Sequence, residues 1–343
     1  IGRVARDLGQ LQYAKEMFEK AHRICVRVYG ENNHRVASCY SDMGRVARDQ
    51  GQLMDAKELF EKALAVGLKV YGENDPNVAD TYRNIGRVAR GLGQLEYAKE
   101  TLLKALTIEI DLHGENNQNV SATYTDIGRL GIRQGNLEYA KEMFEKARLI
   151  IVEVNGEDSR KAATCYNDIG RVARDLGQLQ YAKEMFEKAH RICVRVYGEN
   201  NHRVASCYSD MGRVARDQGQ LMDAKELFEK ALAVGLKVYG ENDPNVADTY
   251  RNIGRVARGL GQLEYAKETL LKALTIEIDL HGENNQNVSA TYTDIGRLGI
   301  RQGNLEYAKE MFEKARLIIV EVNGEDSRKA ATCYNDIGRV ARD

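Results

Sequence analysis

Arginine recurs at one position of a 42-residue pattern, and no other side chain in this sequence is repeated in a way so suited to binding a ligand. A guanidinium can hold a carboxylate through two parallel N–H bonds, so a ladder of arginines could grip the carboxylates of an acidic or C-terminal peptide. The main column contains Arg3, Arg45, Arg87, Arg129, Arg171, Arg213, Arg255, Arg297 and Arg339. A second column, three residues further on, contains Arg6, Arg48, Arg90 and then Ile132, and it repeats in that order.

Aspartates near these arginines support a second interpretation. The position three residues before the main column reads Asp42, Asn84, Asp126 and Asp168. An Asp and an Arg at i,i+3 on a helix are spaced for an ion pair. Each arginine could therefore be neutralised by its own aspartate or by one in the adjacent repeat, and both interpretations stay open.

The stretch from Pro76 to Asn117 departs most from charge balance. Arg83, Asn84, Arg87 and Arg90 lie together there, and only Asp80 opposes them. We therefore expect an anion, if the arginines bind one, at this repeat and its copy. The candidate peptide-binding residues are Arg45, Arg48, Arg83, Asn84, Arg87, Arg90, Arg129, Arg171, Arg213, Arg251, Asn252, Arg255, Arg258 and Arg297.

The elements that position these side chains follow from the period. A fixed period of this length indicates a stacked repeat architecture, which forms one elongated body without internal boundaries. Residues 169–336 duplicate residues 1–168, and 337–343 restart the cycle. We expect one array over 1–343 with partial repeats at 1–33 and 328–343 and full repeats at 34–75, 76–117, 118–159, 160–201, 202–243, 244–285 and 286–327.

Each repeat is predicted to hold two helices. Residues that cap helix N-termini stand at the start of every repeat, at Asn33, Asp75, Asn117 and Ser159. Apolar residues at helical spacing predict a first helix from about 34 to 49, ended by Gly51. A second helix should begin after Gln52 and end at the Gly72 column, and its Glu58–Lys62 pair should face solvent.

Several columns resemble the tetratricopeptide repeat in both residue type and spacing. The matching residues in one repeat are Tyr40, Met43, Gly44, Ala47, Ala56, Phe60 and Ala63. The 42-residue period resembles the longer repeats of kinesin light chains. The resemblance implies an all-α, right-handed superhelical solenoid of antiparallel helix pairs whose concave side, lined by the first helices, binds peptides or protein segments.

Composition argues against other classes of function. Lys and Arg total 50 and Asp and Glu 51, a net charge of −1, so no global field favours nucleic acid or an anionic membrane. The six histidines fall in three unrelated columns, and no cysteines form a CxxC pair. These patterns predict no catalytic set, no metal and no cofactor, and the unpaired cysteines favour a reducing, cytoplasmic compartment.

Three functions remain after these exclusions. The first is a non-catalytic protein-interaction scaffold that binds a protein or peptide segment, acidic in character if the arginines contact it. The second is a structural array that self-associates head to tail, because no polar capping helix covers either end. The third is the sensor region of a larger signalling protein.

Overall fold

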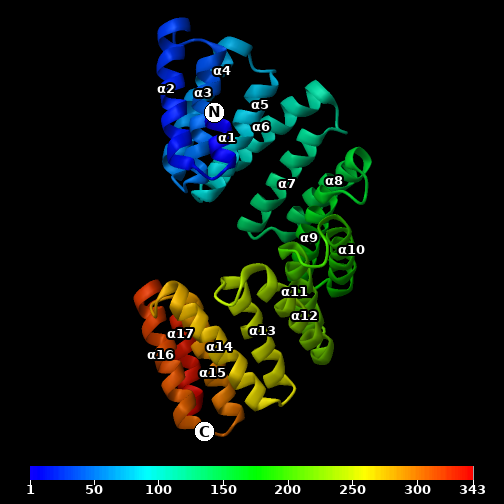
Figure 1. The fold of residues 1–343 in the computed structure, drawn as a ribbon, viewed down its shortest axis with the longest axis vertical. Coiled ribbons are helices and arrows are strands. Elements are labelled where there is room, and N and C mark those ends of the chain that lie inside the picture. The colour runs from blue at the N-terminus through cyan, green and yellow to red at the C-terminus, as the bar shows by residue number, and fades with distance from the viewer. Residues whose placement is uncertain (343) are drawn as a thin grey trace. The chain divides into compact units, whose positions relative to one another are not determined.

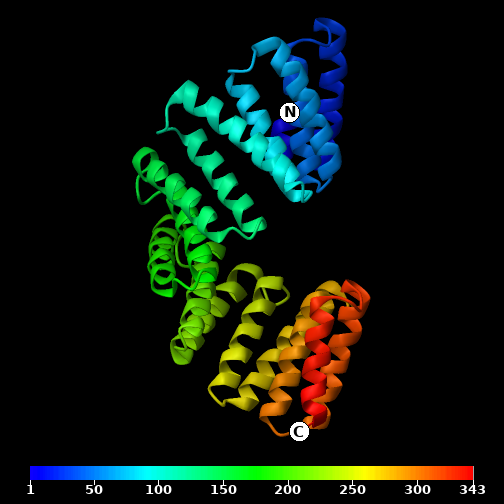
Figure 2. The ribbon, with the colours of Figure 1, turned by 180° about the vertical axis from the view of Figure 1, so that it is seen from behind.

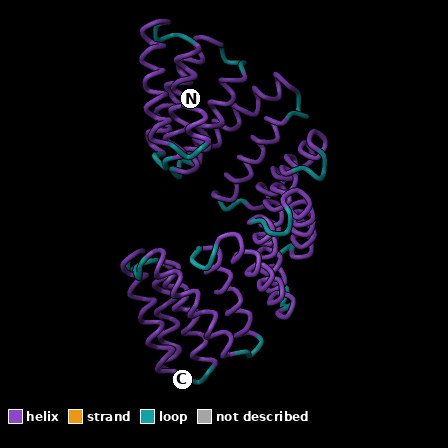
Figure 3. The backbone as a smooth tube through the Cα atoms, in the orientation of Figure 1, coloured by secondary structure: helices purple, strands orange, loops and turns teal. Residues whose placement is uncertain are grey.

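The computed structural model describes residues 1–342, with side chains as far as Val340, and all of its regular elements are α-helices. The described residues contain no strand, which confirms the all-α prediction (Figure 3). The helices are α1 (Gly2–Asp7), α2 (Leu11–Tyr29), α3 (His34–Asp49), α4 (Leu53–Tyr71), α5 (Pro76–Gly91), α6 (Leu95–His113), α7 (Gln118–Arg133), α8 (Leu137–Asn155), α9 (Arg160–Asp175), α10 (Leu179–Tyr197), α11 (His202–Asp217), α12 (Leu221–Tyr239), α13 (Pro244–Gly259), α14 (Leu263–His281), α15 (Gln286–Arg301), α16 (Leu305–Asn323) and α17 (Arg328–Arg342).

The chain forms two compact units, Ile1–Leu176 and Gly177–Asp343, called here the N-terminal and C-terminal units. Within each unit every helix packs on the helix that precedes it and the helix that follows (Figures 1 and 2). The odd-numbered helices α3 to α17 are the first helices of their repeats, and the even-numbered helices are the second helices. The side of each unit formed by the first helices is called the first-helix face.

Capping side chains start the first helices as expected. The side-chain oxygen of Asn33 accepts a hydrogen bond from the Arg35 backbone N–H at 2.9 Å, and that of Asp75 accepts one from Asn77 at 2.7 Å. These bonds satisfy backbone donors that have no partner inside the helix. The caps fix where each first helix begins, and hence which of its side chains reach the first-helix face.

Glycines in the left-handed region end the helices. Gly51 has φ of +78° and Gly72 has φ of +82°, a conformation that residues with a Cβ rarely adopt. The predicted helix limits of about 34 to 49, and of 53 to the residue before Gly72, agree with α3 and α4.

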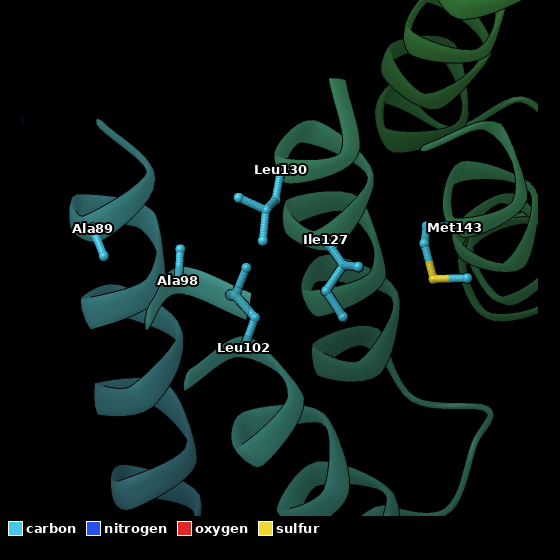
Figure 4. Close-up of a cluster of buried hydrophobic side chains, with 6 residues drawn as sticks. All are labelled: Ala89, Ala98, Leu102, Ile127, Leu130 and Met143. Carbon is cyan, nitrogen blue, oxygen red and sulfur yellow. The ribbon is translucent and has the colours of Figure 1, made fainter. Parts of the chain in front are cut away.

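Small residues allow the two helices of a repeat to approach closely. A Cβ placed on Gly44 would lie 2.9 Å from the ring of Phe60, and one on Gly86 would lie 2.6 Å from Cγ of Leu102. Larger side chains fill the space between consecutive repeats. Figure 4 shows one such cluster, in which the contributing side chains are Ala89, Ala98, Leu102, Ile127, Leu130 and Met143. This dense packing holds the first helices in register.

Exposed Glu–Lys pairs lie on the second helices. Lys62 Nζ lies 2.7 Å from Glu58 Oε1 with both side chains at least half exposed, which confirms the predicted solvated pair. All six cysteines are free thiols, and five of them are buried. Among the described residues no helix is both long and apolar enough to cross a membrane.

Candidate functional site

The main arginine column makes ion pairs from one repeat to the next. Arg87 Nε lies 2.6 Å from Asp126 Oδ2, and the same 39-residue step joins Arg3 to Asp42 at 3.0 Å. Further pairs of this type are Arg129–Asp168 at 3.0 Å, Arg255–Asp294 at 2.6 Å and Arg297–Asp336 at 3.2 Å. The contact with the adjacent repeat, one of the two pairings that the sequence allowed, is therefore the common one.

Arg45 pairs differently, because the next repeat has Asn84 in place of the usual aspartate. Its Nη1 lies 3.1 Å from Asp42 in its own helix, and its Nη2 lies 2.5 Å from Asp80 in α5. Asp80 stands one helical turn before Asn84 and replaces the missing carboxylate. Arg213 repeats this arrangement with Asp210 at 2.8 Å and Asp248 at 2.6 Å.

Asn84 lies beneath the first-helix face and does not reach its surface. It is 2% exposed, its amide nitrogen donates to the Asp80 carbonyl at 2.8 Å, and its Oδ1 accepts from Arg48 at 3.1 Å. Arg48 also pairs with Asp49 at 3.0 Å. Asn252 occupies the same place in the C-terminal unit. These two asparagines orient arginines and can touch a ligand only through them.

Arg83 belongs to a buried polar network that the sequence analysis did not identify. It pairs with Asp80 at 2.9 Å and with Glu109 at 3.3 Å, and Glu109 accepts a 2.6 Å hydrogen bond from Thr123. Glu109 is 3% exposed, and its burial raises the pKa of its carboxyl although Thr123 and Arg83 oppose the shift. The sister residues of Glu109 are Cys25, Gly67 and Ile151, so this acid in an otherwise uncharged column was the available signal.

The carboxyl of Asp80 is the centre of this network. Burial raises its pKa, but the guanidiniums of Arg45 and Arg83 outweigh burial and hold the pKa below its usual range. Asp80 therefore stays ionised and links two repeats, through Arg45 of α3 on one side and, by way of Arg83, Glu109 of α6 on the other.

An open pocket of about 370 Å³ lies on the first-helix face of the C-terminal unit. The arginines that line it are Arg251, Arg255 and Arg297, and Lys329 of α17 adds a fourth cation. The remaining lining comes from Asp294, polar groups of α15 and α17, and apolar atoms that include Ile319, Ala290 and Cys333. This surface suits a short segment that carries both acidic and aliphatic side chains.

The other candidates lie on the same columns without entering that pocket. Arg90 and Arg258 are partly buried near the ends of α5 and α13, and Arg129 is partly exposed on α7. Arg171 is exposed on α9, where it also interacts with other residues of the chain. The described residues contain no group of three or more His, Cys, Asp or Glu side chains able to hold a metal ion.

A family profile described as "Tetratricopeptide repeat" matches this sequence repeatedly. The matched residues are 1–66, 41–109, 78–147, 119–193, 172–234 and 208–279. No curated protein matches the sequence.

Solved structures of low sequence identity share the fold. The chain superposes with a TM-score of 0.69 and 15% identity on a signal-transduction ATPase from Pyrococcus horikoshii with a tetratricopeptide repeat sensor, over 99% of this chain and 50% of that one. Apo RapI gives 0.63 at 16% identity, over 88% of this chain and 99% of that chain. The nearly identical TPR-like repeats of a kinesin light chain from Podosopora anserina give 0.52 at 20% (Q17M form), over 58% and 94%.

Proposed function

Because the chain belongs to the tetratricopeptide-repeat family, we propose that it is an interaction scaffold whose first-helix face binds a segment of a protein partner, and that this segment is acidic. The observation that carries the proposal is the pocket between α13, α15 and α17, which four cationic side chains line against one carboxylate. Its polar walls and apolar patches suit main-chain and side-chain contacts with a peptide.

The ion pairs of the arginines are compatible with a role in binding. Asp294 has an exposed side-chain fraction of 2%, whereas that of its partner Arg255 is 31%, so the carboxylate lies beneath the guanidinium. Arg297 is likewise more exposed than Asp336, with fractions of 44% and 11%. A guanidinium has five N–H donors, and one ion pair leaves several of them for a ligand. The aspartates then hold the arginines in place from below.

Lys329 is the best point at which to test the proposal, because its charge can be reversed without breaking an observed ion pair. We would screen an array of acidic peptides in which each peptide is matched by a version with Asn and Gln in place of Asp and Glu. The acidic peptides should bind the wild-type chain better than their amide versions. Lys329→Glu should weaken that binding by about tenfold or more, through loss of one attraction and gain of one repulsion.

Lys309→Glu provides the matched control. Lys309 is exposed on the second helix α16 and does not line the pocket, and its reversal changes the net charge by the same amount. Ala290→Tyr, which fills the pocket without a change of charge, should also weaken binding. Equal affinities for Lys329→Glu and Lys309→Glu, or equal affinities for the acidic and amide peptides, would refute the proposal.

Two other roles stay predictions. The likeness to the sensor of the Pyrococcus horikoshii ATPase covers 99% of this chain but only 50% of that protein, and it favours a sensor region within a larger protein as the second candidate. Flanking sequence with an ATPase domain would support it. Head-to-tail self-association is testable by sedimentation at several concentrations.

A further inference from the structure

The second arginine column normally stands beside acids, and Arg6 shows which ones. Its Nη2 lies 3.1 Å from Asp7, the next residue in the chain, and its Nε lies 3.8 Å from Asp49 in the next repeat. An arginine of this column therefore meets the residue that follows it and the residue 43 positions further on.

Arg90 has lost both of these acids. Gly91 follows it, and Arg133 stands 43 positions further on, where Arg6 has Asp49. Among the described residues no carboxylate lies within ion-pair distance of Arg90 or Arg133. The polar contact that remains to Arg90 is a 3.4 Å hydrogen bond from its Nη1 to the backbone carbonyl oxygen of Asp126.

The surrounding charges add to this excess. Helices α5 and α7 contact each other directly. The Asp126 carboxylate already forms an ion pair with Arg87 at 2.6 Å, and Asp168 forms one with Arg129 at 3.0 Å. Arg129 and Arg133 are also like charges at i,i+4, which a helix disfavours. Four guanidiniums therefore share two carboxylates.

Burial adds a cost to the same cluster. Desolvation of the guanidinium, followed by repulsion from Arg129, Arg87 and Arg133, lowers the pKa of Arg90, although Asp126 opposes the shift. An arginine stays charged in proteins, so Arg90 holds its charge in a partly buried position beside like charges.

The C-terminal unit contains the same arrangement. Arg258 donates to the Asp294 carbonyl at 3.4 Å, is followed by Gly259 and has Arg301 at the position 43 residues on. Asp294 forms an ion pair with Arg255, and Asp336 forms one with Arg297. Burial and the neighbouring arginines again lower the pKa of Arg258.

We propose that Arg90 and Arg133, flanked by Arg87 and Arg129, form a site for a phosphoryl dianion, and that Arg258 and Arg301 form a second one. Two uncompensated guanidiniums match the double charge of a phosphate monoester, whereas a single carboxylate would leave one cation unpaired. Guanidinium and phosphate also pair through two parallel hydrogen bonds. Phosphate alone can probe the site, so it does not depend on the peptide binding proposed above.

The test is a titration of the chain with inorganic phosphate, followed by the side-chain Nε–H signals of arginine in NMR. We expect saturable shifts at Arg90 and Arg258 that weaken as salt is added, because chloride screens and competes. Arg133→Asp with Arg301→Asp restores the acid that Arg6 has in Asp49. That variant should fold, and it should bind phosphate more weakly by about tenfold or more.

Lys99→Asp with Lys267→Asp makes the same change of net charge on the exposed second helices α6 and α14, and its phosphate affinity should match that of the wild type. Circular dichroism would show that both variants are folded. Absence of saturable shifts in the wild type, or equal affinity in the Arg133→Asp/Arg301→Asp variant, would overturn the proposal.

Peptides separate the two sources of the phosphoryl group. A phosphoserine peptide that binds more tightly than phosphate, while its serine version does not bind, would assign the site to a phosphorylated partner. Equal affinities for phosphate and phosphopeptide would assign it to the free ion. An oligonucleotide that outcompetes both and loses its affinity in the Arg133→Asp/Arg301→Asp variant would contradict the phosphomonoester assignment.

Discussion

Two junctions between neighbouring repeats use the same arginine column in different ways. Between α5 and α7, Arg87 pairs with Asp126, which stands in the aspartate column three residues before the main arginine column. From α3 to α5, that column holds Asn84, and Arg45 pairs instead with Asp80, one turn earlier on the same helix. Charge balance therefore depends on where a carboxylate lies in space, and only loosely on its column in the sequence.

The α3–α5 junction should be the more sensitive of the two to loss of its acid. Asp80 accepts from Arg45, Arg83 and Asn84, so Asp80→Ala removes one hydrogen-bond partner from each of three groups. Removing one partner of a largely buried charge network costs about 3 kcal/mol per site. Urea unfolding of the Asp80→Ala/Asp248→Ala variant, which carries the change in both copies, measures the loss of unfolding free energy. A smaller loss than that caused by removing the Asp126 carboxylate would refute this ranking.

A transplant tests whether the two solutions are interchangeable. Asp126→Asn imitates Asn84 and should cost about 2 kcal/mol, because Arg87 loses a charged hydrogen-bond partner. Ala122 stands where Asp80 stands in its own repeat, so Ala122→Asp added to Asp126→Asn should recover more than half of that loss in urea unfolding. Ala122→Asp on the wild-type background is the control, and failure of the pair to recover stability would show that the α5–α7 junction cannot adopt the other geometry.

The pH dependence should separate the two acids of the α3–α5–α6 network. The folded protein holds the pKa of Asp80 below its ordinary value of 3.8, so the stability that this ionised group contributes is fully present above that value. That stability is lost as the pH falls through the lower folded pKa. The difference in unfolding free energy between the wild type and Asp80→Asn/Asp248→Asn should therefore shrink below about pH 4. A difference that grows on acidification would contradict the sign.

Glu109 should show the opposite slope. Its folded pKa is raised, so ionisation opposes folding and stability falls as the pH rises through the window above its ordinary value of 4.5. Glu109→Gln with Glu277→Gln should remove that slope in chemical denaturation measured between acidic and neutral pH. A slope unchanged from the wild type would show that Thr123 and Arg83 fully offset the burial of Glu109.

The smallest effect is expected away from both junctions. Lys62→Gln breaks the exposed Glu58–Lys62 pair, and we expect a change of about 0.5 kcal/mol or less because solvent screens such pairs. A loss as large as that of Asp126→Asn would mean that the second-helix surface contributes as much as the arginine column.

The helices could be predicted closely because their limits depend on local chemistry. The Asn33 cap and the glycines Gly51 and Gly72 act on the backbone beside them, and each recurs in every repeat. The core residues were predictable for the same reason, since Phe60 and Gly44 follow helical spacing. The candidate site was predicted as columns of arginines, and its acid partners were predicted only as two alternatives.

The repeat, the helix pairs and the arginine columns follow from the order of residues alone, because periodicity and capping are local properties of the chain. Which carboxylate each arginine meets depends on packing, since it is set by how one helix lies against the next repeat. Packing buries Asn84 and brings Glu109 of α6 within hydrogen-bond distance of Thr123 of α7. It also decides the partners of Arg90, for which Arg133 stands at the position that Asp49 has relative to Arg6. Distances between side chains of different repeats are set by packing, and no spacing along the chain records them.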